Sequence, residues 1–324
     1  MLTLDPLAAM ASADGERLGA LLDSVRTDDP AIQKLLDELR AQEGLLLENL
    51  NHLADPDAQI DKAEELRRKW GTQSGQLWQV GPHRLVCGDC RDPDTIRRLW
   101  EGGEKFRMLW CDPSYGVDYA GKNEILNRTD RGNRIQKPIA NDELGPQAVT
   151  AMFRDALKQA LAFAVKGAAC YATVPSGTLL PSFIAAFNDS GFSFKHLLVW
   201  VKNHFVIGMS DYQQRHEPVL YGWREDGPHF FIPDRCQSSV FEVDKPHASD
   251  LHPTTKPVAL MARMIANSSR LGEIVYDPFC GSGSTIVAAA QLKRVGFGCE
   301  LDPGYLAVEL ERLGSLGLKP ELRR

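Results

Sequence analysis

The sequence lacks any long apolar run, and none approaches the roughly 18 residues that a membrane-spanning helix requires. Its first residues include Asp5 and Asp14 and lack the basic segment and apolar core of a secretory signal peptide. A strong excess of one charge is missing as well, since 37 Lys and Arg stand against 43 Asp and Glu in 324 residues. These absences exclude a membrane-spanning chain and predict an ordinary cytoplasmic globular protein.

Cysteine is sparse and scattered, with seven residues in the chain: Cys87, Cys90, Cys111, Cys170, Cys236, Cys280 and Cys299. An odd, scattered set does not form the disulfide framework of a small secreted domain and fits a reducing compartment. Cys87 and Cys90 make one CxxC pair, but no second pair or nearby histidine cluster accompanies it. The pattern therefore argues against a structural zinc site.

The first 70 residues differ from the remainder in charge. Residues 1–70 carry 15 acidic and 8 basic side chains, whereas residues 71–324 carry 28 acidic and 29 basic ones. An amphipathic helix is indicated by the i, i+3, i+4, i+7 spacing of Ile32, Leu35, Leu36 and Leu39. A second helical segment runs from Gln59 to Trp70. We therefore predict a helical N-terminal arm over 1–70, which packs or oligomerises, and a separate domain over 71–324.

From residue 71 onward, strand-like apolar runs alternate with amphipathic helices. This alternation is typical of an α/β fold with a doubly wound, mainly parallel sheet. The predicted strands are His83–Cys87, Phe106–Trp110, Ala168–Val174, Leu197–Val201, Pro218–Trp223, Ile274–Tyr276 and Gly296–Cys299. The predicted helices are Pro146–Val165, Leu179–Asn188, Pro257–Ser268, Ser284–Leu292 and Pro303–Leu313.

A glycine-rich segment, Asp277–Thr285 (DPFCGSGST), lies between a predicted strand and a predicted helix. Strand, glycine turn and helix form the usual nucleotide-binding arrangement. Gly281 and Gly283 permit close backbone approach to a ligand, and Ser284 and Thr285 can cap a helix whose N-terminal amides favour an anion. By itself the segment fits a dinucleotide site and a structural turn equally well, and the missing third glycine counts against NAD.

The next strand adds an acidic group to this segment. Gly296–Cys299 is followed by Glu300 and Asp302, whose position suits hydrogen bonds from ribose hydroxyls. The glycine segment comes late in the chain, so the other strands of the sheet must precede it. If the glycine segment opens the first βαβ unit, the fold is circularly permuted.

A second motif, Asp112–Tyr115 (DPSY), follows the apolar run Met108–Trp110 and so lies at the carboxyl end of a predicted strand. Its residues suit methylation of an exocyclic amine, a poor nucleophile because its lone pair is delocalised into the ring. The Asp112 carboxylate and the Pro113 carbonyl can accept its two N–H bonds and favour a pyramidal nitrogen. Tyr115 can stack on a flipped-out base. Alone, the motif fits an ordinary proline-containing turn better than a catalytic site, and only its context favours the catalytic interpretation.

Together these motifs resemble the amino-group DNA methyltransferases that use S-adenosylmethionine, in particular the permuted class in which the catalytic motif precedes the cofactor motif. Asp112–Tyr115 resembles the catalytic motif, usually Asp-Pro-Pro-Tyr, and Asp277–Thr285 resembles the glycine motif. His252–Leu260 (HPTTKPVAL) is similar to the segment beside the methionine end of the cofactor. Within this family the chain looks closest to the prophage and plasmid DNA methylases, through the segment Gln237–Glu242.

The resemblance covers about residues 76–313 and implies the site residues. Cys87-Gly88-Asp89 is similar to the acidic motif near the adenine, Glu300–Pro303 to the ribose-binding motif and His216–Tyr221 to a further family strand. The implied catalytic residues are Asp112, Pro113, Ser114 and Tyr115. The implied cofactor-binding residues are Asp89, Cys90, Lys256, Pro257, Asp277, Phe279, Gly281, Gly283, Ser284, Thr285, Glu300 and Asp302.

The resemblance also implies the substrate, double-stranded DNA, and its reacting atom. An initial Asp in the catalytic motif is associated with adenine N6 and an initial Ser with cytosine N4, so Asp112 indicates adenine. Methylation of cytosine C5 needs a Pro-Cys nucleophile, and none of the 19 prolines precedes a cysteine. Ser114 departs from the family by replacing the usual second proline, although both predicted hydrogen-bond acceptors remain.

Three alternatives stay open at this point. Cytosine-N4 methylation of DNA uses the same chemistry. Methylation of an RNA base or a protein glutamine also suits such a motif, but motif order argues against most of those enzymes. A DNA-binding regulator with a vestigial methylase site is suggested by Ser114 and by the acidic arm.

Two loops are predicted to contact DNA. The loop at about 116–140 follows Tyr115, and its basic residues are predicted to contact phosphates: Lys122, Arg128, Arg131, Arg134 and Lys137. The stretch at about 222–252 matches the position of the family's target-recognition region and contains Trp223, Arg224, His229, Phe230, Phe231 and Arg235. The alternatives are a solvated surface loop and a capping loop over the sheet. A homodimer, joined by the arm, is a further expectation.

Overall fold

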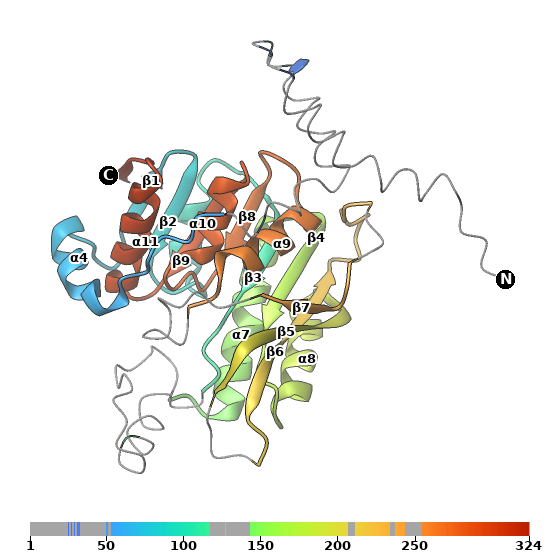
Figure 1. Ribbon diagram of the computed structural model, residues 1–324. Helices are drawn as coiled ribbons and strands as arrows, with labels where there is room; N and C mark the ends of the chain where they lie inside the picture. Colours follow the sequence, from blue (N-terminus) through green and yellow to red (C-terminus); the bar gives the residue numbers. More distant parts are fainter. Residues whose placement is uncertain are drawn as a thin grey trace.

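The computed structural model describes residues 53–116, 143–206, 211–233, 237–243 and 255–323, together with positions 25, 27, 29, 31, 32, 50 and 127. The described residues build one 10-stranded sheet covered by helices on both faces (Figure 1). Among these residues, no helix is long and apolar enough to cross a membrane.

The strands, in chain order, are β1 (Leu77–Val80), β2 (His83–Cys87), β3 (Phe106–Cys111), β4 (Ala164–Thr173), β5 (Ser193–Val206), β6 (Gln214–Trp223), β7 (Val240–Glu242), β8 (Ile274–Asp277), β9 (Val295–Glu300) and β10 (Pro320–Arg323). Their order in the sheet is β10-β1-β2-β9-β8-β3-β4-β6-β5-β7. The central strands β2, β9, β8, β3 and β4 are all parallel, and β6 runs antiparallel between β4 and β5.

The helices are α4 (Ala63–Trp70), α5 (Pro93–Leu99), α7 (Pro146–Ala160), α8 (Leu180–Asp189), α9 (Val258–Ser268), α10 (Ser284–Gln291) and α11 (Pro303–Ser315), with the short 3-10 helices η2 (Ile60–Lys62) and η3 (Leu161–Phe163). Helices α9 and α10 pack on one face of the sheet, and α5, α7 and α8 pack on the other. Helix α4 packs on α11 at the margin, through Ala63 and Leu66 against Ala307 and Val308.

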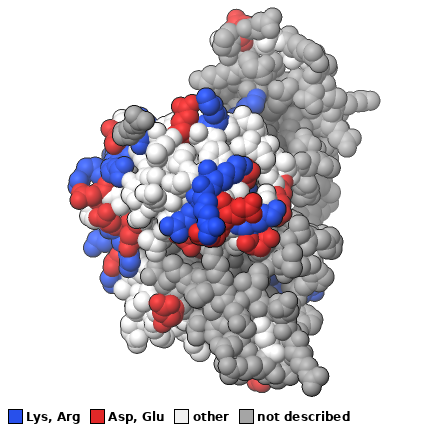
Figure 2. Space-filling view, turned by 90° about the vertical axis from the view of Figure 1, so that its left-hand side faces the viewer, with Lys and Arg blue, Asp and Glu red and all other residues white. Residues whose placement is uncertain are grey.

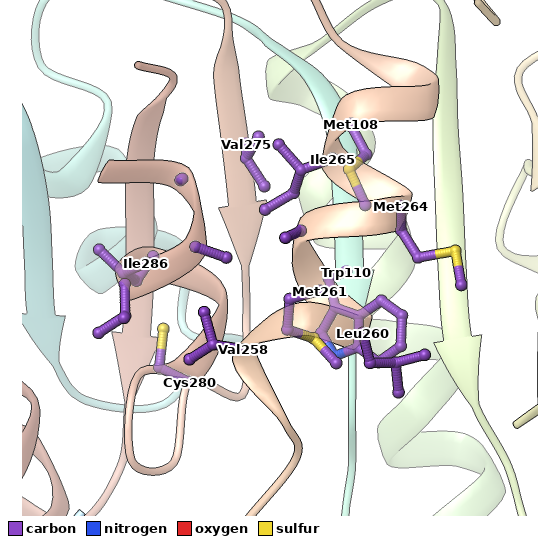
Figure 3. Packing of buried hydrophobic residues seen from close by; sticks show 14 of the residues in the cluster. Met108, Trp110, Val258, Leu260, Met261, Met264, Ile265, Val275, Cys280 and Ile286 are labelled. Atoms are coloured by element: carbon purple, nitrogen blue, oxygen red, sulfur yellow. The ribbon is translucent and has the colours of Figure 1, made fainter. Parts of the chain in front are cut away.

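Strand β3 shows how the two hydrophobic cores arise from one sequence. Met108 and Trp110 point toward α9, where Figure 3 shows them against Met261 and Ile265. The alternating residues Leu109 and Cys111 point to the opposite face and join the core below α7. Side chains alternate across a strand, so a continuous apolar run supplies both cores at once.

The predicted α/β fold is confirmed, and the boundaries of β2 agree with the prediction to the residue. The helix predicted over Pro146–Val165 is wrong at its end, because β4 begins at Ala164, which pairs with Phe106 of β3. Apolar runs look alike in a buried helix and a buried strand, so the boundary is decided by the neighbouring strand.

Several elements escaped prediction. The strands β1, β7 and β10 lie toward the edges of the sheet and have three or four residues each, which is too short a run to show a clear strand pattern in the sequence. Helix α5 has a start signal in the sequence: Asp92 caps it by accepting hydrogen bonds from the amides of Asp94 and Thr95, and Pro93 follows. The predicted segment Gln59–Trp70 is confirmed as η2 and α4, whereas most of the helix predicted around Ile32–Leu39 lies outside the described residues.

Candidate active site

Four acidic side chains from distant parts of the sequence lie at the edge of the sheet that is formed by the carboxyl ends of its central strands. Asp112 follows β3, Asp277 ends β8 and Glu300 ends β9, while Asp89 follows β2. These strands are parallel neighbours, so their carboxyl ends lie together. In α/β sheets this edge is where ligands bind. The fold therefore brings the predicted catalytic motif and the predicted cofactor motifs into one region.

The glycine turn leaves β8 in a backbone conformation that only glycine adopts easily. Gly281 has φ 55° and Gly283 has φ 80°. A Cβ on Gly283 would stand 2.4 Å from Cγ of Glu309, whereas a Cβ on Gly281 would meet no atom within 4 Å. Gly283 is therefore required by packing against α11. Gly281 faces open space, into which a ligand can approach the backbone.

Helix α10 begins at Ser284 with Gly283 as its N-cap. The expectation that Ser284 and Thr285 cap this helix is wrong, because both hydroxyls have other partners. Thr285 Oγ1 donates to Asp277 Oδ2 at 2.6 Å, and Ser284 Oγ accepts from Arg312 at 3.2 Å. Among the described residues, no side chain caps the first amides of α10, which can therefore bind an anion.

Two carboxylates hold this turn, the buried one of Asp277 and the partly buried one of Glu300. Asp277 accepts hydrogen bonds from the Phe279 amide (2.9 Å) and from Thr285, and burial raises its pKa to about 7. Glu300 accepts from the amides of Gly281 (2.7 Å) and Asp302 (2.8 Å), and burial likewise raises its pKa to about 7. Both groups therefore change charge near neutral pH. The carboxylate of Asp302 itself accepts from the Gly304 amide and caps α11.

Asp112 is held by three donors. Lys256 Nζ lies 2.9 Å from Oδ1 and 2.7 Å from Oδ2. Oδ1 also accepts a short hydrogen bond from the Thr173 hydroxyl and a longer one, 3.4 Å, from Tyr115. Pro113 is buried, whereas Ser114 and Tyr115 are partly exposed. The carboxylate of the predicted catalytic motif is thus held in place beside a partly exposed tyrosine.

Lys256 belongs to a chain of alternating charges. Its ammonium group also lies 3.2 Å from Oε2 of Glu217, whose Oε1 is 2.5 Å from Nζ of Lys202. Burial by itself raises the pKa of Glu217, but the ammonium groups of Lys256 and Lys202 lower it to about 2. Burial by itself lowers the pKa of Lys256. The negative charges of Asp112 and Glu217 raise it by more than burial lowers it, so the pKa of Lys256 lies above its ordinary value. Glu217 and Lys256 are therefore both charged at neutral pH.

The comparisons with known proteins agree with this site. A family model described as DNA methylase, N6_N4_Mtase, matches residues 112–311, which include both the Asp112 motif and the glycine turn. The chain belongs to the N6/N4 DNA methylase family. Its predicted cofactor, S-adenosylmethionine, and its predicted fold are thereby confirmed.

Individual methylases are similar to this chain either over a shorter stretch of residues or at a lower sequence identity. The type II methyltransferase M.HpaI of Haemophilus parainfluenzae is 30% identical over 148 residues, which are 39% of this chain and 47% of M.HpaI. The chain therefore spans about half the length of that relative. Among solved structures, the M1.HpyAVI–SAM complex has a TM-score of 0.51 at 20% identity, covering 71% of this chain and 98% of that one. The cytosine-N4-specific PvuII DNA methyltransferase has a TM-score of 0.53 at 12% identity, covering 71% and 86%.

The residues of this methylase fit S-adenosylmethionine at the glycine turn. Gly281 leaves the backbone open, and the first amides of α10 are available to a carboxylate. Glu300 ends the adjacent strand and can accept hydrogen bonds from ribose hydroxyls. Asp89 in contrast is engaged by Arg91, whose guanidinium lies 2.6 Å from Oδ2 and lowers the pKa of Asp89. Cys90 is buried beside it, and the part of the chain that the structure describes holds no group of side chains suited to a metal ion.

The predicted DNA-contacting residues are placed only in part. Lys122, Arg128, Arg131, Arg134 and Lys137 lie outside the described residues. In the predicted recognition region, Trp223 pairs with Ala169 in the middle of β4, and the next amide, of Arg224, donates to the Ala168 carbonyl, so the chain runs away from Thr173 toward the amino end of β4. Trp223 stacks on His229 at a centroid distance of 3.7 Å, and Arg270 of the region after α9 lies over the Phe230 ring.

The first residues of this region therefore pack toward the amino ends of the parallel strands, on the far side of the sheet from Asp112. A capping loop has this position. Its later part returns toward the active-site edge, because β7 runs parallel to β5 with Glu242 beside Val201. Figure 2 views the methylase from the side on which α4 lies in Figure 1, and basic and acidic side chains are intermixed there. Among the described residues on that face, neither sign of charge predominates as it does on a DNA-binding surface.

Sequence reasoning missed three site residues, Thr173, Lys202 and Glu217. Glu217 could have been recognised in the sequence, because this acidic residue directly precedes the largely apolar run Pro218–Trp223 (PVLYGW). Thr173 and Lys202 carried none, because their roles depend on β4, β5 and β6 lying side by side.

The raised pKa of Glu300 leads to a prediction on cofactor binding. Below about pH 7 the folded protein holds Glu300 protonated, and an acid accepts hydrogen bonds more weakly than a carboxylate. We therefore expect the affinity for S-adenosylmethionine to rise as the pH increases from 6 to 8. Isothermal titration calorimetry at these pH values measures it. Glu300→Gln should bind more weakly with a flatter pH dependence, and an unchanged slope in that variant would assign the effect to another group.

Proposed function

We propose that this chain is a DNA methyltransferase that transfers a methyl group from S-adenosylmethionine to the N6 amine of adenine in double-stranded DNA, with the target base flipped out. The observation that carries this proposal is the placement of Asp112. Its carboxylate lies at the carboxyl end of β3, is held by Lys256 and Thr173, and shares a sheet edge with the glycine turn.

The hydrogen bonds of Asp112 indicate which oxygen receives the substrate. Oδ1 accepts from Lys256, Thr173 and Tyr115, whereas Oδ2 accepts from Lys256 alone among the described donors. A carboxylate oxygen has two lone pairs, so Oδ2 retains one for an N–H of the target amine. The Pro113 carbonyl is the second acceptor. Together they leave the lone pair of the nitrogen directed away from the ring.

The charges of the site suit the reaction. S-adenosylmethionine, when bound, supplies an electrophilic methyl group on a sulfonium. The amine nitrogen becomes positive as its bond to the methyl carbon forms and the methyl–sulfur bond breaks, with the electron pair of that bond returning to sulfur. The negative Asp112 stabilises the charge on the nitrogen, which then loses one proton to water. Lys256 forms an ion pair with Asp112, with Nζ 2.9 Å from Oδ1 and 2.7 Å from Oδ2. Tyr115, partly exposed beside Asp112, offers its ring for stacking on the flipped base.

The test is to incubate the protein with S-adenosylmethionine and unmethylated genomic DNA, digest the DNA to nucleosides and identify the modified base by mass spectrometry. We expect N6-methyladenine. N4-methylcytosine would keep the mechanism but overturn the base assignment, because Asp112 and the Pro113 carbonyl can accept from either amine. Cofactor binding without any modified base would instead favour the regulator with a vestigial site.

The finer family assignment is also part of the proposal. A circularly permuted order is supported by the position of β8, which lies beside β3 in the sheet but follows it in the chain with the glycine turn. The likeness to prophage and plasmid methylases, a restriction–modification role, a cytoplasmic location and a homodimer stay predictions.

The basic segment after Tyr115, predicted to be a loop, gives a prediction on DNA binding. Replacing Arg131 and Arg134 by glutamine should weaken DNA binding and lower the slope of log affinity against log salt by about two, since each phosphate contact contributes about one. Fluorescence anisotropy over a salt titration measures both. Replacement of the paired surface residues Arg67 and Arg68 of α4 serves as the control and should leave the slope unchanged. An unchanged slope in the loop variant would contradict the phosphate contacts.

A further inference from the structure

A short segment before η2 lies across the helices that carry the cofactor motifs. Ala54 exchanges two hydrogen bonds with the side chain of Gln291 in α10, at 2.8 and 2.7 Å. The neighbouring Asp55 accepts from the amide of Val258, the first residue of α9, at 3.2 Å. Its other carboxylate oxygen lies 2.7 Å from the guanidinium of Arg312 in α11. These two residues of the arm thus contact three helices of the methylase domain.

Arg312 carries this contact to the glycine turn. It is buried, with only 1% of its surface exposed. Its Nε donates to the Pro56 carbonyl at 2.8 Å, and one terminal nitrogen donates to the Ser282 carbonyl at 2.6 Å and to the Ser284 hydroxyl at 3.2 Å. The guanidinium is therefore clamped between the arm on one side and the turn between Gly281 and Gly283 on the other.

The contact at α9 has a physical reason. The N-cap of this helix is Pro257, which has no side-chain acceptor for the orphan amides of the first turn. Asp55 supplies that acceptor from a distant part of the chain, and its negative charge suits the positive end of the helix dipole. Val258 follows directly on Lys256 and Pro257, so the cap also fixes where the Asp112–Lys256 pair lies.

We propose that Asp55 is a positioning residue for the cofactor site, which joins the start of α9 to the glycine turn through Arg312. The proposal rests on the assignment of S-adenosylmethionine to these two motifs. Without Asp55, the first turn of α9 loses its cap and the buried Arg312 loses its carboxylate partner. The two halves of the cofactor site then no longer share a rigid connection, and cofactor affinity falls.

The arm offers a matched control on the same helix. Glu311, next to Arg312, accepts from Lys69 at 2.7 Å and from the Trp70 indole at 2.9 Å, so it also joins the arm to α11. Neither of these two contacts reaches the cofactor motifs. Glu311→Gln therefore loosens the arm without disturbing the path from Asp55 to the glycine turn.

The experiment measures the dissociation constant of S-adenosylmethionine by calorimetry on the full chain, with kcat and the KM values for cofactor and DNA. We expect Asp55→Ala to raise the dissociation constant and the cofactor KM about fivefold to tenfold, with little change in the KM for DNA. Asp55→Asn, which can still cap α9, should recover part of the loss. Glu311→Gln should bind the cofactor as the wild type does, even if its melting temperature falls as much as that of Asp55→Ala.

Two results would overturn the positioning role. One is an unchanged cofactor affinity in Asp55→Ala, and the other is an equal loss in Glu311→Gln, which would make the effect one of general stability. If the wild-type protein itself fails to bind S-adenosylmethionine, the assigned cofactor site is wrong and the role of Asp55 falls with it.

Discussion

Asp112→Ala should lower the rate of methyl transfer by about a hundredfold to a thousandfold, the size of effect seen when one group that stabilises transition-state charge is removed. Affinity for S-adenosylmethionine should change little, because the glycine turn and Glu300 are held by Asp277 and backbone amides rather than by Asp112. Single-turnover transfer of a radiolabelled methyl group measures the rate, and calorimetry measures the cofactor affinity.

Two further variants sharpen this test. Asp112→Asn retains the shape of the side chain and an acceptor for Thr173 but loses the charge, so it should be nearly as slow as the alanine variant. Ser114→Pro restores the usual motif and should retain full activity, because Ser114 supplies no acceptor in the proposed chemistry. If Asp112→Ala keeps most of the wild-type rate, the assignment of the catalytic motif is wrong.

The second large effect is expected from Lys256→Met. This change leaves Asp112 and Glu217 without the ammonium group between them, although Glu217 keeps Lys202. Removing one partner of a buried ion pair costs about 3–5 kcal/mol. The four side chains are 11–22% exposed, so partial screening by water reduces the expected loss to about 2–3 kcal/mol. Urea unfolding at pH 7 measures the loss, and methyl transfer should be abolished as well.

The pH dependence of this loss has a definite sign. The pKa of Glu217 is lowered from 4.5 to about 2 in the folded protein, so its ion pairs stabilise the fold above pH 4.5. That contribution is lost as the pH falls toward 2. The difference between wild type and Lys256→Met should therefore be largest at neutral pH and shrink in acid. A difference that grows in acid would contradict the charged state assigned to Glu217.

An exposed ion pair provides the control for this variant. Lys69→Met removes a contact to Glu311 in which the lysine side chain is 55% exposed. Such pairs contribute within about 1 kcal/mol because water and salt screen them. The stability of Lys69→Met should therefore stay close to that of the wild type at every pH, which separates the loss of any lysine from the loss of the buried one.

Local patterns in the sequence predicted much of the fold. The strands around Asp112, Asp277 and Glu300 follow from apolar runs, and the glycine turn follows from its residues, since both signals lie within a few positions. The start of β4 and the cap of α10 were predicted wrongly for the opposite reason. Whether Ala164 continues a helix depends on its pairing with Phe106, and whether Thr285 caps a helix depends on Asp277 accepting its hydroxyl.

The sequence by itself determined the α/β class and the family and predicted the catalytic and cofactor motifs, because these depend on periodicity and on contiguous residues. Only the tertiary structure decided what holds the motifs in place: Thr173 and Lys256 on Asp112, Lys202 on Glu217, and Asp55 on Arg312. Each of these contacts joins residues that are far apart in the chain. Their existence depends on strand order and helix packing, which minimise buried unpaired charge over the whole fold and leave no local trace in the sequence.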